Sequence, residues 1–140
     1  MPTWIFYAIL SMIFAGLTSV IAKFGLKNVS GDAGLAVRTS FVFLLVWLNT
    51  IAFRHTREFG QLTAKDILFL GISAVTTTLS WIYYYRAIKM GDLSVVAVID
   101  KASIVITLIL SFWLLKEPFT WRMGLAAALI ISGLLVLTIK

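Results

Sequence analysis

Three ionisable residues lie inside long apolar segments of this chain, where water does not solvate their charge. Arg38 falls in the apolar stretch 35–53, and the adjacent Asp100 and Lys101 fall in the stretch 93–115. A charge at the centre of a membrane helix costs roughly 2.5–3.5 kcal/mol on insertion scales, so residues of this kind tend to serve a function. Asp100 is the only carboxylate well inside such a stretch. It is therefore the one candidate for carrying a proton.

The spacing of these charges favours a specific pairing. At 1.5 Å of rise per residue, Arg38 lies roughly 5 Å and Asp100 roughly 10 Å from the start of its stretch. Both stretches run in the same direction, so we expect Arg38 and Asp100 to form a buried ion pair. Asp100 and Lys101 are about 100° apart around a helix, and we expect them to face different neighbours. The plainer alternative is that Lys101 reaches the headgroups and that Asp100 only stabilises packing.

Hydroxyl and aromatic side chains recur along one side of the stretch 64–85. They are Ser73, Thr77, Ser80, Trp81 and Tyr84, and the polar side is widened by Thr76, Thr78, Tyr83 and Tyr85. Aromatic residues near the end of a span are typical of an interfacial belt. The deeper hydroxyls indicate either the wall of a water-filled cavity or hydrogen bonds between helices, and the pattern does not separate the two.

The composition places these residues in a membrane protein. The 140 residues are 61% hydrophobic and 13% charged, against about 45–50% and about 25% in soluble domains. The net charge of +6 is dispersed and forms no patch for nucleic acid. There is no cysteine, which excludes disulfides and thiolate metal sites. Since the one histidine, His55, lies in a charged loop, no catalytic or metal-binding set can be assembled, and we expect neither an enzyme nor a cofactor.

Five apolar stretches are long enough to cross a bilayer, which takes about 20 residues. We expect transmembrane helices at 3–22, 35–53, 64–85, 93–115 and 121–139. Thr63 to Asp66 forms a capping box that opens the third span. The short loops make consecutive helices antiparallel neighbours. The predicted fold is an all-α membrane protein, with residues 1–140 in one bundle of five transmembrane helices.

The basic residues give little preference for one orientation in the membrane. On the N-terminal side the five are Arg54, Arg57, Lys65, Lys116 and Arg122. On the other side the five are Lys23, Lys27, Arg86, Lys89 and Lys140, with Arg38 and Lys101 close by. An excess normally faces the cytoplasm. The chain therefore either has one weakly biased orientation or inserts both ways and pairs antiparallel.

Several motifs in the chain match those of a known family. They are Tyr84-Tyr85-Arg86-Ala87, the Gly91-Asp92 turn, Ile99-Asp100-Lys101, Leu114-Leu115-Lys116-Glu117, a glycine-containing last span, Arg38, and Ala22 to Gly25. Their order resembles the EamA-type domain of the drug/metabolite transporter superfamily over essentially the whole chain. Val98 stands where relatives commonly have a proline, so the resemblance does not extend to a proline-broken fourth helix.

The resemblance implies half of a carrier. Larger members of the family have two five-helix repeats of inverted topology that enclose a cavity. A single repeat then needs an antiparallel second copy or a homologous half-transporter. On this basis we expect an exporter of small organic metabolites or drugs that works by alternating access in the cytoplasmic membrane of a prokaryote. Its partners would be lipid and substrate, not nucleic acid. The alternative is a non-transporting subunit that completes or stabilises another membrane complex.

The resemblance also suggests a substrate site at one mouth of the bundle. The candidates are Arg38, Ser80, Trp81, Tyr84, Arg86, Asp100 and Lys101. Trp81 and Tyr84 would contact the body of the substrate. Asp100 would carry a proton or counter a cation, and Arg38 or Lys101 would meet an anionic group. Glu117 resembles the family's recurrent glutamate and is expected to be a helix-end residue without a chemical role.

Overall fold

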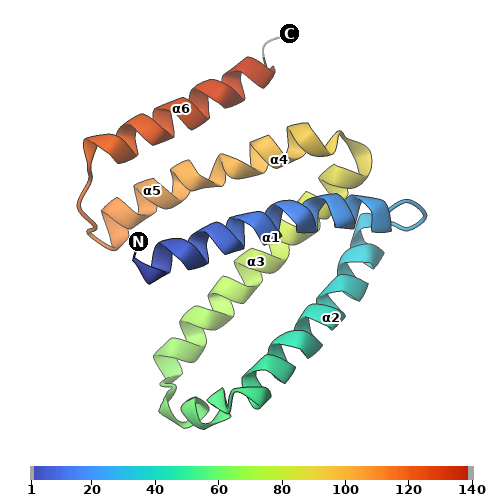
Figure 1. Ribbon diagram of the computed structural model, residues 1–140, viewed down its shortest axis with the longest axis vertical. Helices are drawn as coiled ribbons and strands as arrows, with labels where there is room; N and C mark the ends of the chain where they lie inside the picture. The colour runs from blue at the N-terminus through green and yellow to red at the C-terminus, as the bar shows by residue number, and fades with distance from the viewer. Residues whose placement is uncertain (1, 139–140) are drawn as a thin grey trace. The chain divides into compact units, whose positions relative to one another are not determined.

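The computed structural model describes residues 2–138, and all regular structure in that range is helical (Figure 1). The helices are α1 (Thr3–Gly25), α2 (Gly31–Ala52), the 3-10 helix η1 (His55–Gln61), α3 (Ala64–Met90), α4 (Leu93–Lys101), α5 (Ser103–Leu114) and α6 (Trp121–Thr138). Met1, Ile139 and Lys140 lie outside the described residues, so the end of the fifth expected span and one counted basic residue are not described.

The expected all-α membrane fold is confirmed. Within the described range 2–138, four helical stretches are long and apolar enough to cross a membrane, namely Thr3–Gly25, Gly31–Ala52, Ala64–Met90 and Leu93–Leu114. A shorter apolar helix follows at Trp121–Leu137. Nearly all large apolar side chains of these helices are exposed, which is how a helix meets lipid rather than water. The chain is therefore an integral membrane protein.

The helices differ from the expected spans at several ends. The second begins at Gly31 rather than residue 35, because Ser30 caps it by accepting a hydrogen bond from the Ala33 amide at 3.2 Å. The third continues to Met90. At its start the expected capping box is present: the Thr63 hydroxyl accepts from the Asp66 amide at 3.3 Å, and the Asp66 carboxylate accepts from the Thr63 amide at 2.9 Å.

The chain forms two compact units, one up to Met90 and one from Gly91. In the first unit, α2 and α3 are the main packing partners, and η1 connects them through a turn at Arg54, which adopts a left-handed φ of 59°. Among the described residues the buried apolar side chains are Leu26, Leu35, Tyr85 and Ile88. All four belong to this unit.

The closest approach in the first unit is between the start of α2 and the end of α3. A Cβ placed on Gly31 would lie 2.8 Å from the Tyr85 carbonyl oxygen, which is shorter than any normal contact. Gly31 is therefore required by packing, because only a residue without a side chain lets the two backbones meet here. This contact fixes the depth at which Tyr85 sits beside α2.

In the second unit the fourth expected span is interrupted at Ala102, between α4 and α5. The Ala102 amide donates to the Ile99 carbonyl and the Val105 amide donates to the Ala102 carbonyl, both at 3.0 Å. These are three-residue steps in place of the four-residue steps of an α-helix, so the helix tightens for one turn. The interruption occurs with Val98 in place of a proline, and no residue type in the sequence predicts it.

Candidate functional site

Basic side chains close one end of the first unit, where α1 and α3 finish and α2 begins. Lys89 donates to the carbonyl oxygens of Leu26 and Lys27 at 2.5 and 3.0 Å, beyond the end of α1. In return Lys23, near the end of α1, donates to the Ile88 carbonyl of α3. The last carbonyls of a helix lack partners within it, and a cation at that end also complements the helix dipole. Each helix thus caps the other.

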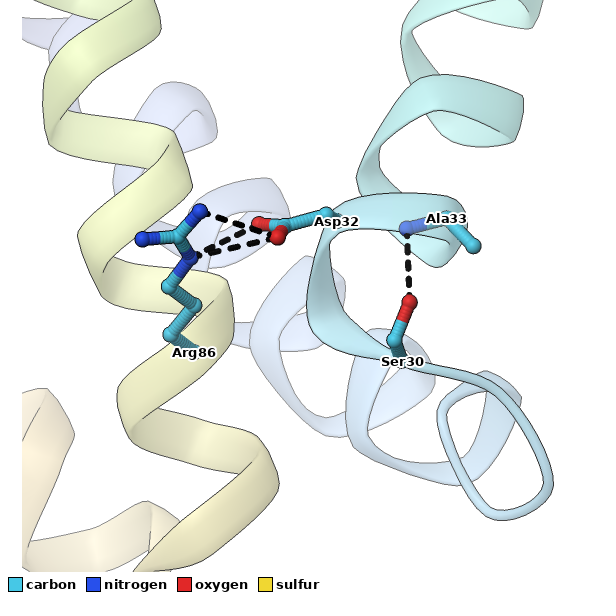
Figure 2. Close-up of polar contacts among 4 residues, drawn as sticks. All are labelled: Ser30, Asp32, Ala33 and Arg86. Atoms are coloured by element: carbon cyan, nitrogen blue, oxygen red, sulfur yellow. Dashed lines mark hydrogen bonds and ion pairs between the residues drawn. The ribbon is translucent and has the colours of Figure 1, made fainter.

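Arg86 forms an ion pair with Asp32 at the same end. Its Nε and Nη2 atoms donate to Oδ1 and Oδ2 at 2.9 Å each, in the two-pronged arrangement that carboxylates accept from arginine (Figure 2). Asp32 lies in the first turn of α2, where a negative charge complements the dipole of the helix. Both side chains are about half exposed, so the pair lies at the rim of the unit rather than inside it.

Arg38 lies deeper along α2 and contacts aromatic rings instead of a carboxylate. Its guanidinium carbon is 4.7 Å from the centre of the Trp81 ring and 5.9 Å from that of Tyr85. Since α2 begins at Gly31, Arg38 stands about 10 Å along the helix, deeper than the roughly 5 Å expected from the sequence. A cation over an aromatic face is stabilised by the ring's electron density, yet the ring carries no net charge to neutralise it.

A groove of about 690 Å³ opens beside Arg38 on the first unit. Its lining residues come from α1, α2, the loop between them and α3, and they are Thr18, Ile21, Ala22, Gly25, Leu26, Val29, Ala33, Gly34, Val37, Arg38, Phe41, Val42, Leu45 and Tyr85. Arg38 is the one charged side chain among them. The Tyr85 hydroxyl is buried and has no hydrogen-bond partner among the described residues. The groove is thus an apolar surface with two polar groups able to donate hydrogen bonds.

Tyr84 connects α3 to α1 on another side of the helix. Its hydroxyl donates to the Ser19 hydroxyl at 2.9 Å, and both side chains are partly buried. Ser19 in turn donates to the Ala15 carbonyl of its own helix at 3.2 Å. The sequence analysis singled out Tyr84 as a substrate contact but did not link it to Ser19.

Three threonines on the polar side of α3 donate hydrogen bonds to carbonyls of their own helix. Thr76 and Thr77 both donate to the Ser73 carbonyl, at 2.9 and 2.8 Å, and Thr78 donates to the Ala74 carbonyl at 2.8 Å. These three hydroxyls therefore have their hydrogen-bond acceptors within their own helix. None of the three residues lines the groove. Ser80 is exposed on α3.

The charged residues of the fourth span lie in the second unit. Asp100 and Lys101 form an ion pair with each other at 3.4 Å, and the neighbours that each was expected to face stay a prediction. The lysine side chain is long and flexible enough to turn back toward the adjacent carboxylate. Because Arg38 and Asp100 belong to different units, their pairing stays a prediction. Glu117 is exposed beyond the end of α5.

Of the seven candidate residues, the structure brings Arg38 and Trp81 into contact, and it places Arg86 apart from them, on Asp32 at the rim of the unit. Sequence reasoning missed four contacts at this end of the unit: Tyr85 beside Arg38, Asp32 on Arg86, and Lys23 and Lys89 on backbone carbonyls. Asp32 carried a usable signal, because Ser30 followed by an acidic residue marks a helix start. The lysines carried none, since their acceptors are backbone carbonyls. Within residues 2–138 no group of three or more His, Cys, Asp or Glu side chains could hold a metal ion.

The family comparison agrees with this architecture. The sequence pattern of the EamA-like transporter family matches residues 2–139. The chain belongs to this family. A relative from Sinorhizobium sp, named an uncharacterized transporter in the cobO 3' region, is 34% identical over 137 residues, which is 98% of this chain and 97% of the relative. No solved structure matches. The EamA resemblance expected from the sequence is thereby confirmed, and transport is the general activity of the family to which the chain belongs.

Proposed function

We propose that this EamA protein is a carrier that moves small organic molecules by alternating access, with the groove beside Arg38 as its substrate surface. The observation that carries the proposal is the groove itself, about 690 Å³ in volume and almost wholly apolar except at Arg38, Thr18 and Tyr85. Small-molecule sites in proteins have this size and this mixture of apolar wall with a few polar groups. The transporter family and the transporter name of the Sinorhizobium relative support it.

A second copy in the opposite orientation completes the carrier in this proposal. Five spans place the two ends of a domain on opposite sides of the membrane, so two such domains of opposite orientation can enclose a site between them. The balanced count of lysine and arginine on the two sides supports insertion both ways. The direction of transport in the proposal is export, across the cytoplasmic membrane of a prokaryote, and the bacterial relative supports that location.

The proposed roles of the polar residues follow from their contacts. Trp81 and Tyr84 are not among the residues that line the groove, and in the proposal they border the substrate path beyond it, with Ser80 as the exposed hydroxyl next to Trp81 on α3. Arg86 acts as a positioning residue, because its guanidinium is already engaged by Asp32. Asp100 carries the coupling proton in the proposal. When Asp100 takes up the proton, its carboxylate charge is lost and its ion pair with Lys101 is weakened.

Transport is tested by reconstituting the purified chain into liposomes and measuring uptake of a panel of organic anions, cations and neutral solutes. We expect saturable flux that Asp100→Asn and Arg38→Gln remove, while Arg57→Gln in the exposed η1 leaves it unchanged. Absence of flux for every solute, from protein that is folded and correctly inserted, would overturn the carrier and favour the non-transporting subunit.

The antiparallel arrangement is tested separately by topology. A reporter fused after Lys140 is read on both sides of the cell membrane, and we expect signal on both. Signal on one side alone would contradict dual insertion while leaving transport itself open to the flux measurement. Cross-linking of cysteines introduced singly on the loop after α2 would then show whether like ends or opposite ends meet.

A further inference from the structure

Arg38 is a cation without a carboxylate in its own unit. The first unit contains three carboxylates, and each is engaged elsewhere: Asp32 pairs with Arg86, Glu58 with His55, and Asp66 with Thr63. None of them approaches Arg38 within ion-pair distance. Among the described residues of this unit, the partners of the guanidinium are the ring faces of Trp81 and Tyr85, at 4.7 and 5.9 Å. A positive charge about 10 Å along a membrane helix is thus left without an opposite charge in this unit.

The other cations at this end of the unit are either bound to other groups or exposed. Arg86 is held by Asp32, and Lys89 and Lys23 donate to the carbonyls that end α1 and α3. Lys27 is exposed on the loop. Arg38 differs from all of them, because its side chain lies in the wall of the groove.

A second polar group on the groove is also without a partner. The side chain of Tyr85 is 4% exposed, and its hydroxyl has no hydrogen-bond partner among the described residues. A buried hydroxyl without a partner is costly, so such a group indicates a missing acceptor. The third polar lining residue, Thr18, donates to the Phe14 carbonyl at 2.7 Å and is already satisfied. Arg38 and Tyr85 are therefore the two donors that the groove offers.

We propose that the occupant of this groove is a small organic anion, whose anionic group binds the Arg38 guanidinium and the Tyr85 hydroxyl and whose apolar body lies against α1 and α2. The inference rests on the proposed function and names its substrate class. Charge complementarity selects an anion, and the aliphatic walls select an apolar or aromatic body. The position of Arg38 favours a solute over a lipid headgroup as its partner. Lipid phosphates lie at the bilayer surface, whereas Arg38 lies about 10 Å along its helix.

The test measures binding rather than flux, using two probes that share one body and differ in charge. The probes are 9-anthracenecarboxylate and 9-anthracenemethylammonium, added to the full chain in phosphatidylcholine nanodiscs. Trp81 serves as the energy-transfer donor in a background in which the other four tryptophans are replaced by phenylalanine: Trp4, Trp47, Trp113 and Trp121. Nanodiscs without protein report the partition of each probe into lipid, which is subtracted.

We expect the carboxylate to bind saturably and at least about tenfold more tightly than the ammonium, since a hydrogen bond to a charged group is worth roughly a tenfold to hundredfold change in affinity. Arg38→Gln should abolish this preference, whereas Arg38→Lys, which keeps the charge, should retain it. Tyr85→Phe should weaken carboxylate binding about threefold to tenfold. Arg57→Gln, in the exposed η1, is the matched control and should change nothing.

Four results would overturn the inference. Equal binding of the two probes to the unaltered site, or a preference that survives Arg38→Gln, would show that Arg38 does not select charge. Anion binding that appears only after Asp100→Asn would show that Asp100 neutralises Arg38. Displacement of the carboxylate by phosphatidylglycerol in the nanodisc would assign the groove to lipid.

Failure of this inference is distinguishable from failure of the proposed function. Anion binding without flux would contradict the carrier while keeping the assignment of the groove. Flux of cationic or neutral solutes, together with no anion preference in the binding assay, would keep the carrier and overturn the substrate class. If Arg38→Gln fails to fold, Arg38→Lys and the comparison of the two probes on the unaltered site still test whether the groove prefers an anion.

Discussion

Arg86 binds Asp32 through two hydrogen bonds of 2.9 Å, Nε to Oδ1 and Nη2 to Oδ2, and so joins the end of α3 to the first turn of α2. The two residues are 54 positions apart in the sequence. Beside them, Gly31 lets the α2 backbone approach the Tyr85 carbonyl. The ion pair and the close contact together define how α2 and α3 meet, and with them the position of Tyr85 on the groove.

The contribution of the ion pair is expected to be small and dependent on salt. Both side chains are half exposed, and such pairs contribute little to stability. Asp32→Asn and Arg86→Gln should each lower the melting temperature in detergent by only about 1–3 °C, and the double variant by no more than the larger single effect. Raising the salt concentration should shrink the differences. Fully additive losses would contradict a direct pairing.

Gly31→Ala should be strongly destabilising. Its new methyl group would lie 2.8 Å from the Tyr85 carbonyl oxygen, and backbone cannot yield as a flexible side chain can. We expect a loss of about 1–3 kcal/mol, the cost typical of overpacking. The matched control is Gly71→Ala in α3, where nothing lies within 4 Å. Unfolding by denaturant in mixed micelles compares the two variants, and equal stability would contradict the close contact.

The hydrogen bond from Tyr84 to Ser19 is tested by a double-mutant cycle. Tyr84→Phe and Ser19→Ala each remove one partner of the 2.9 Å contact while keeping most of the side-chain volume. We expect a coupling free energy of about 0.5–1 kcal/mol, as for hydrogen bonds between membrane helices. Tyr83→Phe, whose side chain is 66% exposed, is the control. A coupling near zero would show that the two hydroxyls do not hold α1 to α3.

Exchanging the charges of Arg38 and Asp100 separates the sequence-based ion pair from the anion site. If the two form a pair, Arg38→Asp combined with Asp100→Arg should restore flux that either change alone removes. If Arg38 binds the anionic group of the substrate, the exchange removes the binding charge and flux stays absent. We expect the second result, with flux at background in the double variant. Recovery of flux to more than about a tenth of the original rate would favour the ion pair. A tenfold loss of rate corresponds to about 1.4 kcal/mol in activation free energy.

The sequence predicted the helices well because hydropathy and length determine what can cross a bilayer. The capping box at Thr63 and Asp66 was also predictable, since both partners lie within one turn. The α2 start was misplaced by four residues, because Gly31 and Asp32 resemble a turn although Ser30 caps a helix there. The interruption at Ala102 was missed because it involves no proline or glycine.

The site was less predictable than the fold. Arg38 and Trp81 were both identified from their types, but their contact depends on how α2 packs on α3. The lysines that cap α1 and α3 bind carbonyl oxygens, which every residue possesses, so no residue type marks the acceptor. The threonines of α3 donate to the carbonyl one turn earlier in the same helix. Any threonine in a helix can form this bond, so the residue type and spacing alone do not show what the hydroxyl contacts.

The tightened turn at Ala102 divides the span Leu93–Leu114 into two arms of unequal reach. At 1.5 Å per residue, α4 is about 14 Å long and α5 about 18 Å. With Ala102 as the fulcrum, a change of about 10° in the bend would carry the far end of α5 through about 3 Å, roughly the width of one water molecule. Asp100 and Lys101 lie two residues and one residue before Ala102, so a change in their charge acts where a small local shift becomes a larger displacement at the far end of α5.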